Sequence, residues 1–144
     1  MIVDISLLDD QIPVPAYAHP GDAGLDLRAA IAGTLEPFER MTVPCGFAAA
    51  IPDGYAGLVI PRSGLASKHG VSVVNAPGLV DSGYRGEIKV VLVNLDPRES
   101  FHFEQGDRIA QLTIIATPSV TLHNTDQLPE SPRGTEGFGS SGIR

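Results

Sequence analysis

Hydrophobic residues recur along this chain in short runs that favour β-strands. Between positions 41 and 51 every second residue is apolar, which is the period of a strand with one buried face. This face consists of Met41, Val43, Cys45, Phe47, Ala49 and Ile51. By the same pattern, strands are predicted at 2–8, 25–31, 40–51, 55–61, 71–74, 87–94, 100–103, 108–117 and 120–123.

Residues typical of turns separate these runs and leave room for one short helix. Turn signals lie at 20–22, 52–54, 81–83, 96–97 and 105–107, and the helix is predicted at 63–69. The segment 71–94 is predicted to form a β-hairpin. Many short strands at this spacing indicate an all-β sandwich or barrel.

The composition favours one β-domain followed by a tail. The length of 144 residues fits one domain, and 16 glycines and 12 prolines would interrupt long helices. The chain is 42% hydrophobic, too apolar for a disordered protein. We predict a β-domain over 1–128 and a flexible, glycine-rich C-terminal arm over 129–144 that belongs to the same functional unit.

Charge and cysteine content exclude several classes of protein. A net charge of −7 opposes non-specific binding to nucleic acid, which requires many phosphates to be neutralised at once. We expect no membrane partner, because no apolar stretch reaches the ~18 residues of a membrane span. The first residues lack the basic start of a secretory signal. The single cysteine, Cys45, cannot form an internal disulfide, so a cytoplasmic location is expected.

The first segment with candidate chemistry lies where a predicted strand leads into the predicted helix. Arg62, Ser63 and Gly64 there combine a guanidinium, a hydroxyl and a backbone open to close approach, which together suit an anion. The alternative is that Ser63 is a plain N-cap of the helix.

Two further segments are equally ambiguous when taken alone. Asp81 and Tyr84 lie in a glycine-rich turn, where both could border one pocket. The alternative is that Asp81 is only a turn-forming residue and Tyr84 only a packing residue. The segment 106–112 fits a turn that leads into a buried strand, except that Gln111 is polar. We also consider that Asp107 and Arg108 form structural pairs, and that Glu87 and Lys89 form the solvated face of a strand.

The segment 133–142 contains a formal G-x-G-x-x-G pattern from Gly137 to Gly142. That motif binds dinucleotides only where it opens a helix after a strand, so we reject this interpretation. A disordered tail is the usual alternative. An arginine, an aromatic ring and two serines between glycines nevertheless suit a loop that closes over a phosphorylated ring.

In their order and spacing, these segments resemble the trimeric dUTP pyrophosphatase (dUTPase) family. The five matching segments are 23–27, 61–64, 75–86, 106–112 and 133–142. The resemblance implies a jelly-roll-like, distorted β-barrel and a homotrimer whose three sites are each built from more than one chain. It also implies hydrolysis of dUTP to dUMP and pyrophosphate, which keeps uracil out of DNA and supplies dUMP for dTMP synthesis.

The resemblance also implies residue roles. Asp81 would activate the water that attacks the α-phosphorus, and Tyr84 would pack against deoxyribose and exclude a 2′-hydroxyl. Mg²⁺ would bind the phosphates without a direct protein ligand, with Asp26 in its outer shell through water. The other implied substrate-binding residues are Arg62, Ser63, Gly64, Asn75, Gly78, Leu79, Val80, Ile88, Lys89, Gln111, Arg133, Phe138, Gly139, Ser140 and Ser141.

Two other functions remain open. A dCTP deaminase, or a bifunctional dCTP deaminase–dUTPase, shares the fold and parts of the second and third motifs. The complete fifth motif and the sequence from Asp81 to Gly86 favour the dUTPase instead, and zinc-dependent deamination would need more than one cysteine. The alternative from another class is a non-catalytic nucleotide-sensing or protein-binding module, against which the intact Asp81, Tyr84 and arm argue.

Overall fold

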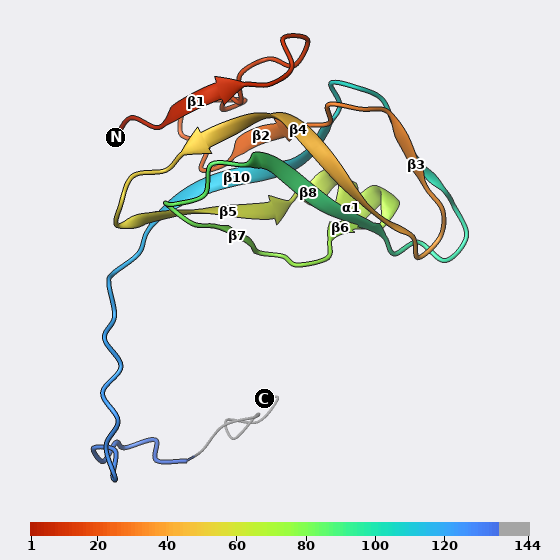
Figure 1. The fold of residues 1–144 in the computed structure, drawn as a ribbon. Coiled ribbons are helices and arrows are strands. Elements are labelled where there is room, and N and C mark those ends of the chain that lie inside the picture. Colours follow the sequence, from red (N-terminus) through yellow and green to blue (C-terminus); the bar gives the residue numbers. More distant parts are fainter. Residues whose placement is uncertain (136–144) are drawn as a thin grey trace.

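Two four-stranded antiparallel sheets face each other in the computed structural model, which describes residues 1–135 (Figure 1). The first sheet has the order β1 (Asp4–Leu7), β4 (Arg40–Ala50), β8 (Glu87–Asn94), β6 (Val71–Val73). The second has the order β2 (Leu25–Arg28), β10 (Arg108–Ala116), β5 (Tyr55–Pro61), β7 (Gly78–Val80). A small third sheet pairs β3 (Gly33–Leu35) with β9 (Phe101–Phe103). The all-β, jelly-roll-like prediction is confirmed.

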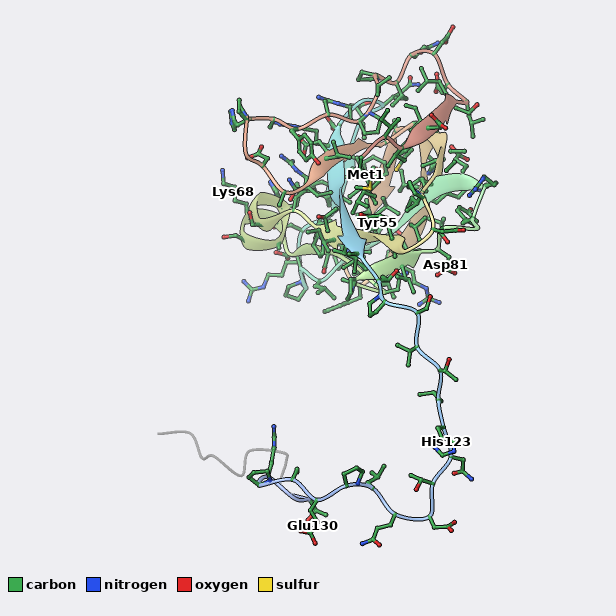
Figure 2. The ribbon with its side chains drawn as sticks, turned by 90° about the vertical axis from the view of Figure 1, so that its left-hand side faces the viewer. Met1, Tyr55, Lys68, Asp81, His123 and Glu130 are labelled. Atoms are coloured by element: carbon green, nitrogen blue, oxygen red, sulfur yellow. The ribbon has the colours of Figure 1, made fainter. Side chains whose placement is uncertain are left out.

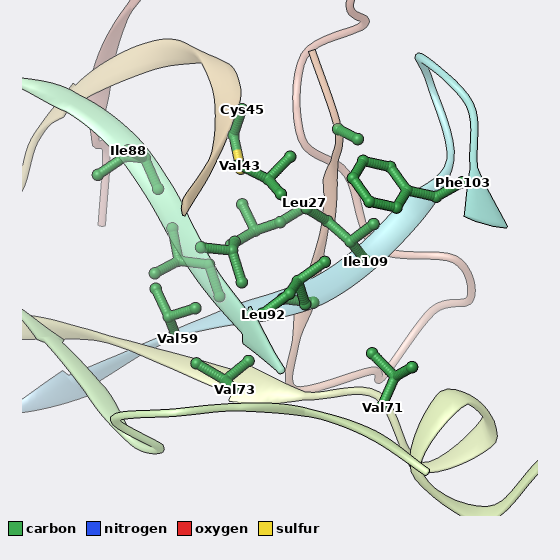
Figure 3. Close-up of a cluster of buried hydrophobic side chains, with 14 of the residues drawn as sticks. Leu27, Val43, Cys45, Val59, Val71, Val73, Ile88, Leu92, Phe103 and Ile109 are labelled. Atoms are coloured by element: carbon green, nitrogen blue, oxygen red, sulfur yellow. The ribbon is translucent and has the colours of Figure 1, made fainter. Parts of the chain in front are cut away.

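The hydrophobic core lies between the two large sheets (Figure 3). The alternation predicted for β4 is confirmed, because Val43, Cys45 and Phe47 are buried. They meet apolar side chains of the opposing sheet such as Leu27 and Ile109. Each fully buried aliphatic side chain of this kind contributes roughly 1.5–3 kcal/mol to folding.

The short helix α1 (Ser63–His69) follows β5 directly and has the predicted bounds. It ends at Gly70, whose φ of 65° lies in the left-handed region and whose N–H group donates to the Ala66 carbonyl at 3.2 Å. A glycine adopts this conformation without strain, so it closes the helix. Lys68 and His69 occupy the last turn.

The predicted hairpin over 71–94 forms only at its outer ends. β6 pairs with β8, with Val71 opposite Asn94, but β7 leaves this sheet and pairs with β5 in the other one. The sequence pattern identified neither β7 nor β3 as strands. The strand predicted at 120–123 is wrong, because these residues are extended chain with exposed side chains.

The chain leaves the sandwich after β10 (Figure 1). Residues 118–135 are exposed throughout, and the labelled His123 and Glu130 stand well away from the sheets (Figure 2). Among the residues that the structure describes, no helix is long and apolar enough to cross a membrane.

Candidate active site

A pocket of about 190 Å³ lies between the end of β7 and the start of β8. Its wall consists of Leu79, Val80, Asp81, Tyr84, Glu87, Ile88 and Lys89. All of these except Glu87 are site residues predicted from the sequence. The fold gathers them because β7 joins the second sheet and β8 the first, so the connecting turn bridges both sheets.

The turn that carries Asp81 is held by backbone hydrogen bonds. The Tyr84 N–H group donates to the Asp81 carbonyl at 3.1 Å, and the Tyr84 hydroxyl donates to the Glu87 carbonyl at 3.0 Å. The Arg85 Nη1 donates to the carbonyls of Ser82 and Tyr84 at 2.5 and 2.8 Å. The turn therefore presents the exposed Asp81 carboxylate from a fixed backbone.

Two of the predicted residues lie beside this pocket rather than in its wall. Gly78 begins β7 and is buried, while Asn75 is exposed just before it. A Cβ atom added to Gly78 would lie only 3.1 Å from Nδ2 of Asn75. The absence of a side chain at Gly78 therefore lets the Asn75 amide pack close to the β7 backbone.

A second cluster of charged side chains surrounds Asp26 on β2. This aspartate is only 7% exposed. Its Oδ2 atom lies 3.2 Å from Nη1 of Arg108, and its Oδ1 atom lies 3.3 Å from Nε of Arg62. Gln111 of β10 stands directly opposite Asp26 in the sheet register, so both side chains lie on the same face.

One oxygen of this buried carboxylate has unused bonding capacity. Although Arg62 is close, its approach does not meet hydrogen-bond geometry, and Asp26 Oδ1 has no hydrogen-bond partner among residues 1–135. A buried acceptor of this kind is costly unless something donates to it. The charged cluster therefore has room for one more donor, such as a water molecule.

The start of α1 adjoins the same cluster. Arg62 occupies the N-cap position with extended backbone, and Ser63 and Gly64 are the exposed first residues of the helix. No side chain of the described residues caps this end, so the interpretation of Ser63 as a plain N-cap is wrong. A second pocket, of about 260 Å³, opens beside Arg62 and Arg108.

The two clusters lie far apart within one chain. Gly57 of β5 is opposite Val80, which places Asp81 near Ala56, whereas Arg62 follows six residues later. At about 3.3 Å per residue this separation is ~20 Å. Figure 2 accordingly shows Asp81 on the side of the molecule opposite to Lys68 at the end of α1.

From the sequence, two residues of these clusters are not predicted as site residues: Arg108 is expected only in a structural pair, and Glu87 only on a solvated strand face. Arg108 is an ion-pair partner of Asp26. The register of β10 with β2 is irregular between Arg108 and Ala110, so the strict alternation of side chains between the two faces of the sheet does not hold there. Glu87 is not simply solvated, because its Oε1 accepts from the Gly46 N–H group at 3.0 Å and its Oε2 lies 3.8 Å from Lys89 Nζ. The run of charges around Tyr84 was the only available signal for Glu87.

The predicted residues of the arm lie at or beyond the limit of what the structure describes. Arg133 is exposed. Phe138, Gly139, Ser140 and Ser141 lie outside the described residues. Within residues 1–135, no three His, Cys, Asp or Glu side chains are grouped so that they could hold a metal ion.

Comparison with known proteins identifies the family. The dUTPase family model matches residues 10–142. The deoxyuridine 5′-triphosphate nucleotidohydrolase of Streptomyces griseus subsp. griseus is 57% identical over 138 residues, which cover 96% of this chain and 78% of that protein. The enzyme of the same name from Leifsonia xyli subsp. xyli is 56% identical over 140 residues, which cover 97% and 91% of the two chains.

Solved structures show the same likeness. The dUTPase of Staphylococcus bacteriophage 80alpha with dUpNHpp superimposes with a TM-score of 0.91 and 30% identity over 99% of both chains. A variant of the dUTPase of phage phi11 of S. aureus, described as coordinating a structural Mg(II) ion, matches with a TM-score of 0.81 and 25% identity over 88% and 98% of the chains. The chain therefore belongs to the dUTPase family and is an enzyme of the dUTP diphosphatase type.

Proposed function

We propose that this dUTPase cleaves dUTP by attack of water on the α-phosphorus, with Asp81 as the base. The water oxygen bonds to phosphorus, its proton passes to the Asp81 carboxylate, and the α–β bridging oxygen leaves with pyrophosphate. The observation that carries this proposal is the pocket in which Asp81 and Tyr84 lie against the ends of β7 and β8. A carboxylate at the rim of such a pocket can orient water towards a bound nucleotide.

The backbone around the pocket suits a uracil ring. Among residues 1–135, β7 is the last strand of its sheet, so the N–H and C=O groups of β7 that point away from β5 are available for hydrogen bonds. Within the described residues, β6 pairs with β8 only from Leu92 onward, which leaves that edge of Ile88 and Lys89 without a strand partner. These groups and Asn75 would bind the uracil edge and leave no space for a 5-methyl group.

The cluster around Asp26 suits the phosphate chain. Arg62, Ser63, Gly64 and Gln111 would bind the α- and β-phosphates, with the free N–H groups of the α1 start as further donors. No atom lies within 4 Å of a Cβ built on Gly64, so a ligand can approach the backbone there. Arg133, Ser140 and Ser141 would bind the γ-phosphate, while Phe138 stacks on uracil and Gly139 lets the arm close.

The residues present fit an Mg²⁺ ion bound through water. The unpartnered Oδ1 of Asp26 can accept a hydrogen bond from a metal-bound water molecule, which agrees with an outer-shell role. Bound to the triphosphate, Mg²⁺ would supply charge neutralisation for the leaving pyrophosphate. The Asp26 side chain would meanwhile hold Arg62 and Arg108 in place through the two ion pairs.

The separation of the two clusters supports a homotrimer with sites shared between subunits. Asp81 and Arg62 of one chain are ~20 Å apart along β5, too far for both to contact one α-phosphate. A second copy of the chain can bring its own Arg62 to the Asp81 pocket. The exposed segment 118–135 leaves the sandwich and would carry the arm to such a composite site.

The cellular role proposed for the enzyme follows from its reaction. Removal of dUTP keeps uracil out of DNA, and the dUMP formed supplies dTMP synthesis. The single, buried cysteine supports a reducing compartment, which would be the cytoplasm.

Pyrophosphate release from dUTP, dTTP, dCTP and UTP tests this function. With Mg²⁺ we expect release from dUTP alone, its loss in EDTA and its recovery when Mg²⁺ is restored. Asp81→Asn should lower kcat by about 10²–10⁴-fold because the base is removed, while binding of dUpNHpp persists. Asp10→Asn, at an exposed aspartate, is the matched control.

Three results would contradict the proposal. Turnover that survives Asp81→Asn would remove Asp81 from its role as base. Release of ammonia from dCTP would instead establish the deaminase alternative, and dUTP binding without any turnover would establish the non-catalytic one.

A further inference from the structure

Tyr84 and Gly86 are packed against each other at the wall of the nucleoside pocket. A Cβ atom built on Gly86 would lie 2.6 Å from Cζ and 3.0 Å from Cε2 of the Tyr84 ring, and closer still to its hydroxyl oxygen. Real Cβ atoms do not approach other atoms so closely, so the ring occupies the space that any other residue at position 86 would fill.

Backbone conformation does not account for this glycine. Glycine is often required where φ is positive, but Gly86 is not among the glycines with positive φ. An alanine could therefore adopt the Gly86 backbone without strain. What the site requires from Gly86 is the absence of a side chain facing Tyr84.

Tyr84 is 45% exposed, and hydrogen bonds of its hydroxyl and carbonyl hold the ring in its observed position. Its hydroxyl donates to the Glu87 carbonyl at 3.0 Å. Glu87 is itself fixed, because its side chain accepts from Gly46 at a bulge of β4 where the register between Pro44 and Ala48 is irregular. The Tyr84 carbonyl is also bound by Arg85. A group added at position 86 would therefore push the ring outward and break the bond to Glu87.

We propose that Gly86 is a specificity-determining position of this enzyme, because it sets where the Tyr84 ring meets the sugar. The inference rests on the proposed function, in which Tyr84 packs against deoxyribose and excludes a 2′-hydroxyl. Gly86 acts through Tyr84 and is a positioning residue. The backbone bond from the Tyr84 N–H group to the Asp81 carbonyl does not involve the ring, so we expect Asp81 to keep its place when the ring moves.

The test compares Gly86→Ala with Gly83→Ala, a control in the same turn. Gly83 also lacks positive φ, and a Cβ built there meets no atom within 4 Å. For each variant, kcat and KM are measured with dUTP and with UTP. We expect Gly86→Ala to raise KM for dUTP and to lower the dUTP/UTP ratio of kcat/KM by about tenfold, while kcat for dUTP stays within about threefold. Gly83→Ala should retain the wild-type ratio.

A double-mutant cycle shows whether Gly86 acts through the ring. In a Tyr84→Ala background the ring is absent, so adding Gly86→Ala should leave the dUTP/UTP ratio unchanged. The double variant also removes the clash, so this comparison stands even if Gly86→Ala alone fails to fold, as judged by circular dichroism.

The outcomes separate this inference from the proposed function. Wild-type enzyme that does not discriminate dUTP from UTP would overturn the role of Tyr84 itself. If the wild type discriminates and folded Gly86→Ala keeps the same ratio, the inference about Gly86 is overturned. An equal effect of Gly86→Ala with and without the Tyr84 ring would also overturn it.

Discussion

Asp26 is a buried carboxylate whose charge is balanced by two arginines, Arg62 at the N-cap of α1 and Arg108 at the start of β10. Removing a carboxylate from water costs several kcal/mol unless partners compensate, and a pair that loses one partner is strongly destabilised. Arg62 also donates to the Arg108 carbonyl at 3.1 Å, so the three residues form one connected unit. The unit fixes two guanidinium groups next to the start of α1, where the phosphates are proposed to bind.

Cys45 shows how burial controls a reactive group. Burial, together with the nearby Glu87 charge, raises the pKa of the thiol to about 12. We therefore expect the folded protein at pH 8 to resist alkylation by iodoacetamide and the protein in urea to react. Rapid labelling of folded protein would contradict the burial.

The same pKa shift gives the stability a pH dependence. Because the folded pKa lies above the unfolded value near 9, the contribution of the neutral thiol is fully present below pH 9 and is lost as the pH rises towards 12. Between these limits, wild-type protein should lose up to about 1.4 kcal/mol of unfolding free energy per pH unit relative to Cys45→Val. Urea denaturation of both proteins from pH 8 to 11 measures the difference. Parallel curves would contradict it.

At the scale of elements, residues 118–135 lie outside the packed sandwich. All of their side chains are exposed, so this segment contributes nothing to the core. Deletion of residues 133–144 should lower turnover by about two orders of magnitude, because substrate would no longer be enclosed and aligned. The unfolding free energy should change by no more than about 0.5 kcal/mol.

Steady-state kinetics and urea denaturation of the truncated protein measure the two effects. A comparable loss of activity and stability would mean that the arm is a structural element rather than a closing loop. An internal control is Thr121→Ser, a conservative change in the exposed segment that should affect neither quantity.

Elements with a strong local signal could be predicted from the sequence. The apolar residues of the eleven-residue β4 alternate along its sequence, and α1 lies between Pro61 and Gly70, which mark its ends. β3 and β7 have three residues each and both begin with glycine, which is depleted in strands, whereas the equally short β6 and β9 are rich in valine and phenylalanine and are predicted. The segment 120–123 has strand-like composition but no neighbouring strand within the described chain, and strands depend on such pairing.

For the site too, local motifs could be predicted from the sequence, whereas contacts between distant residues could not. Asp81, Tyr84 and their neighbours follow each other closely in sequence, so a local motif identified them. Arg108 could not be assigned to Asp26, because that ion pair joins residues 82 positions apart and depends on a register shift. Glu87 looked solvated for a similar reason, since its partner Gly46 belongs to another strand.

At the scale of the whole molecule, net charge is a poor guide to the ligand. The chain carries −7 overall, yet residues 61–144 hold eight of its ten basic side chains. Arg62 and Arg108 lie beside one pocket, next to the place proposed for the phosphate chain. Such local placement, rather than the total charge, determines whether an acidic protein can bind a triphosphate.

If active sites are shared between subunits, two inactive variants should restore activity when they are mixed in one oligomer. Asp81→Asn and Arg62→Ala should each be inactive as pure proteins, since each removes one side of every site. If a site takes Asp81 from one subunit and Arg62 from another, mixed trimers recover sites in which both residues are intact. For an equal, random mixture about a quarter of the sites should be active, because each of the two independent positions is intact half of the time.

The mixture is prepared by unfolding the two variants together and refolding them, with trimer formation checked by analytical ultracentrifugation. A mixture of Asp81→Asn with Asp81→Ala is the control, because no arrangement of these subunits restores the base. If each site instead used Asp81 and Arg62 of the same chain, every subunit would carry one defect and mixing would recover nothing. The ~20 Å between these residues along β5 argues for recovery, since no rearrangement that keeps β5 paired with β7 and β10 can close that distance within one chain.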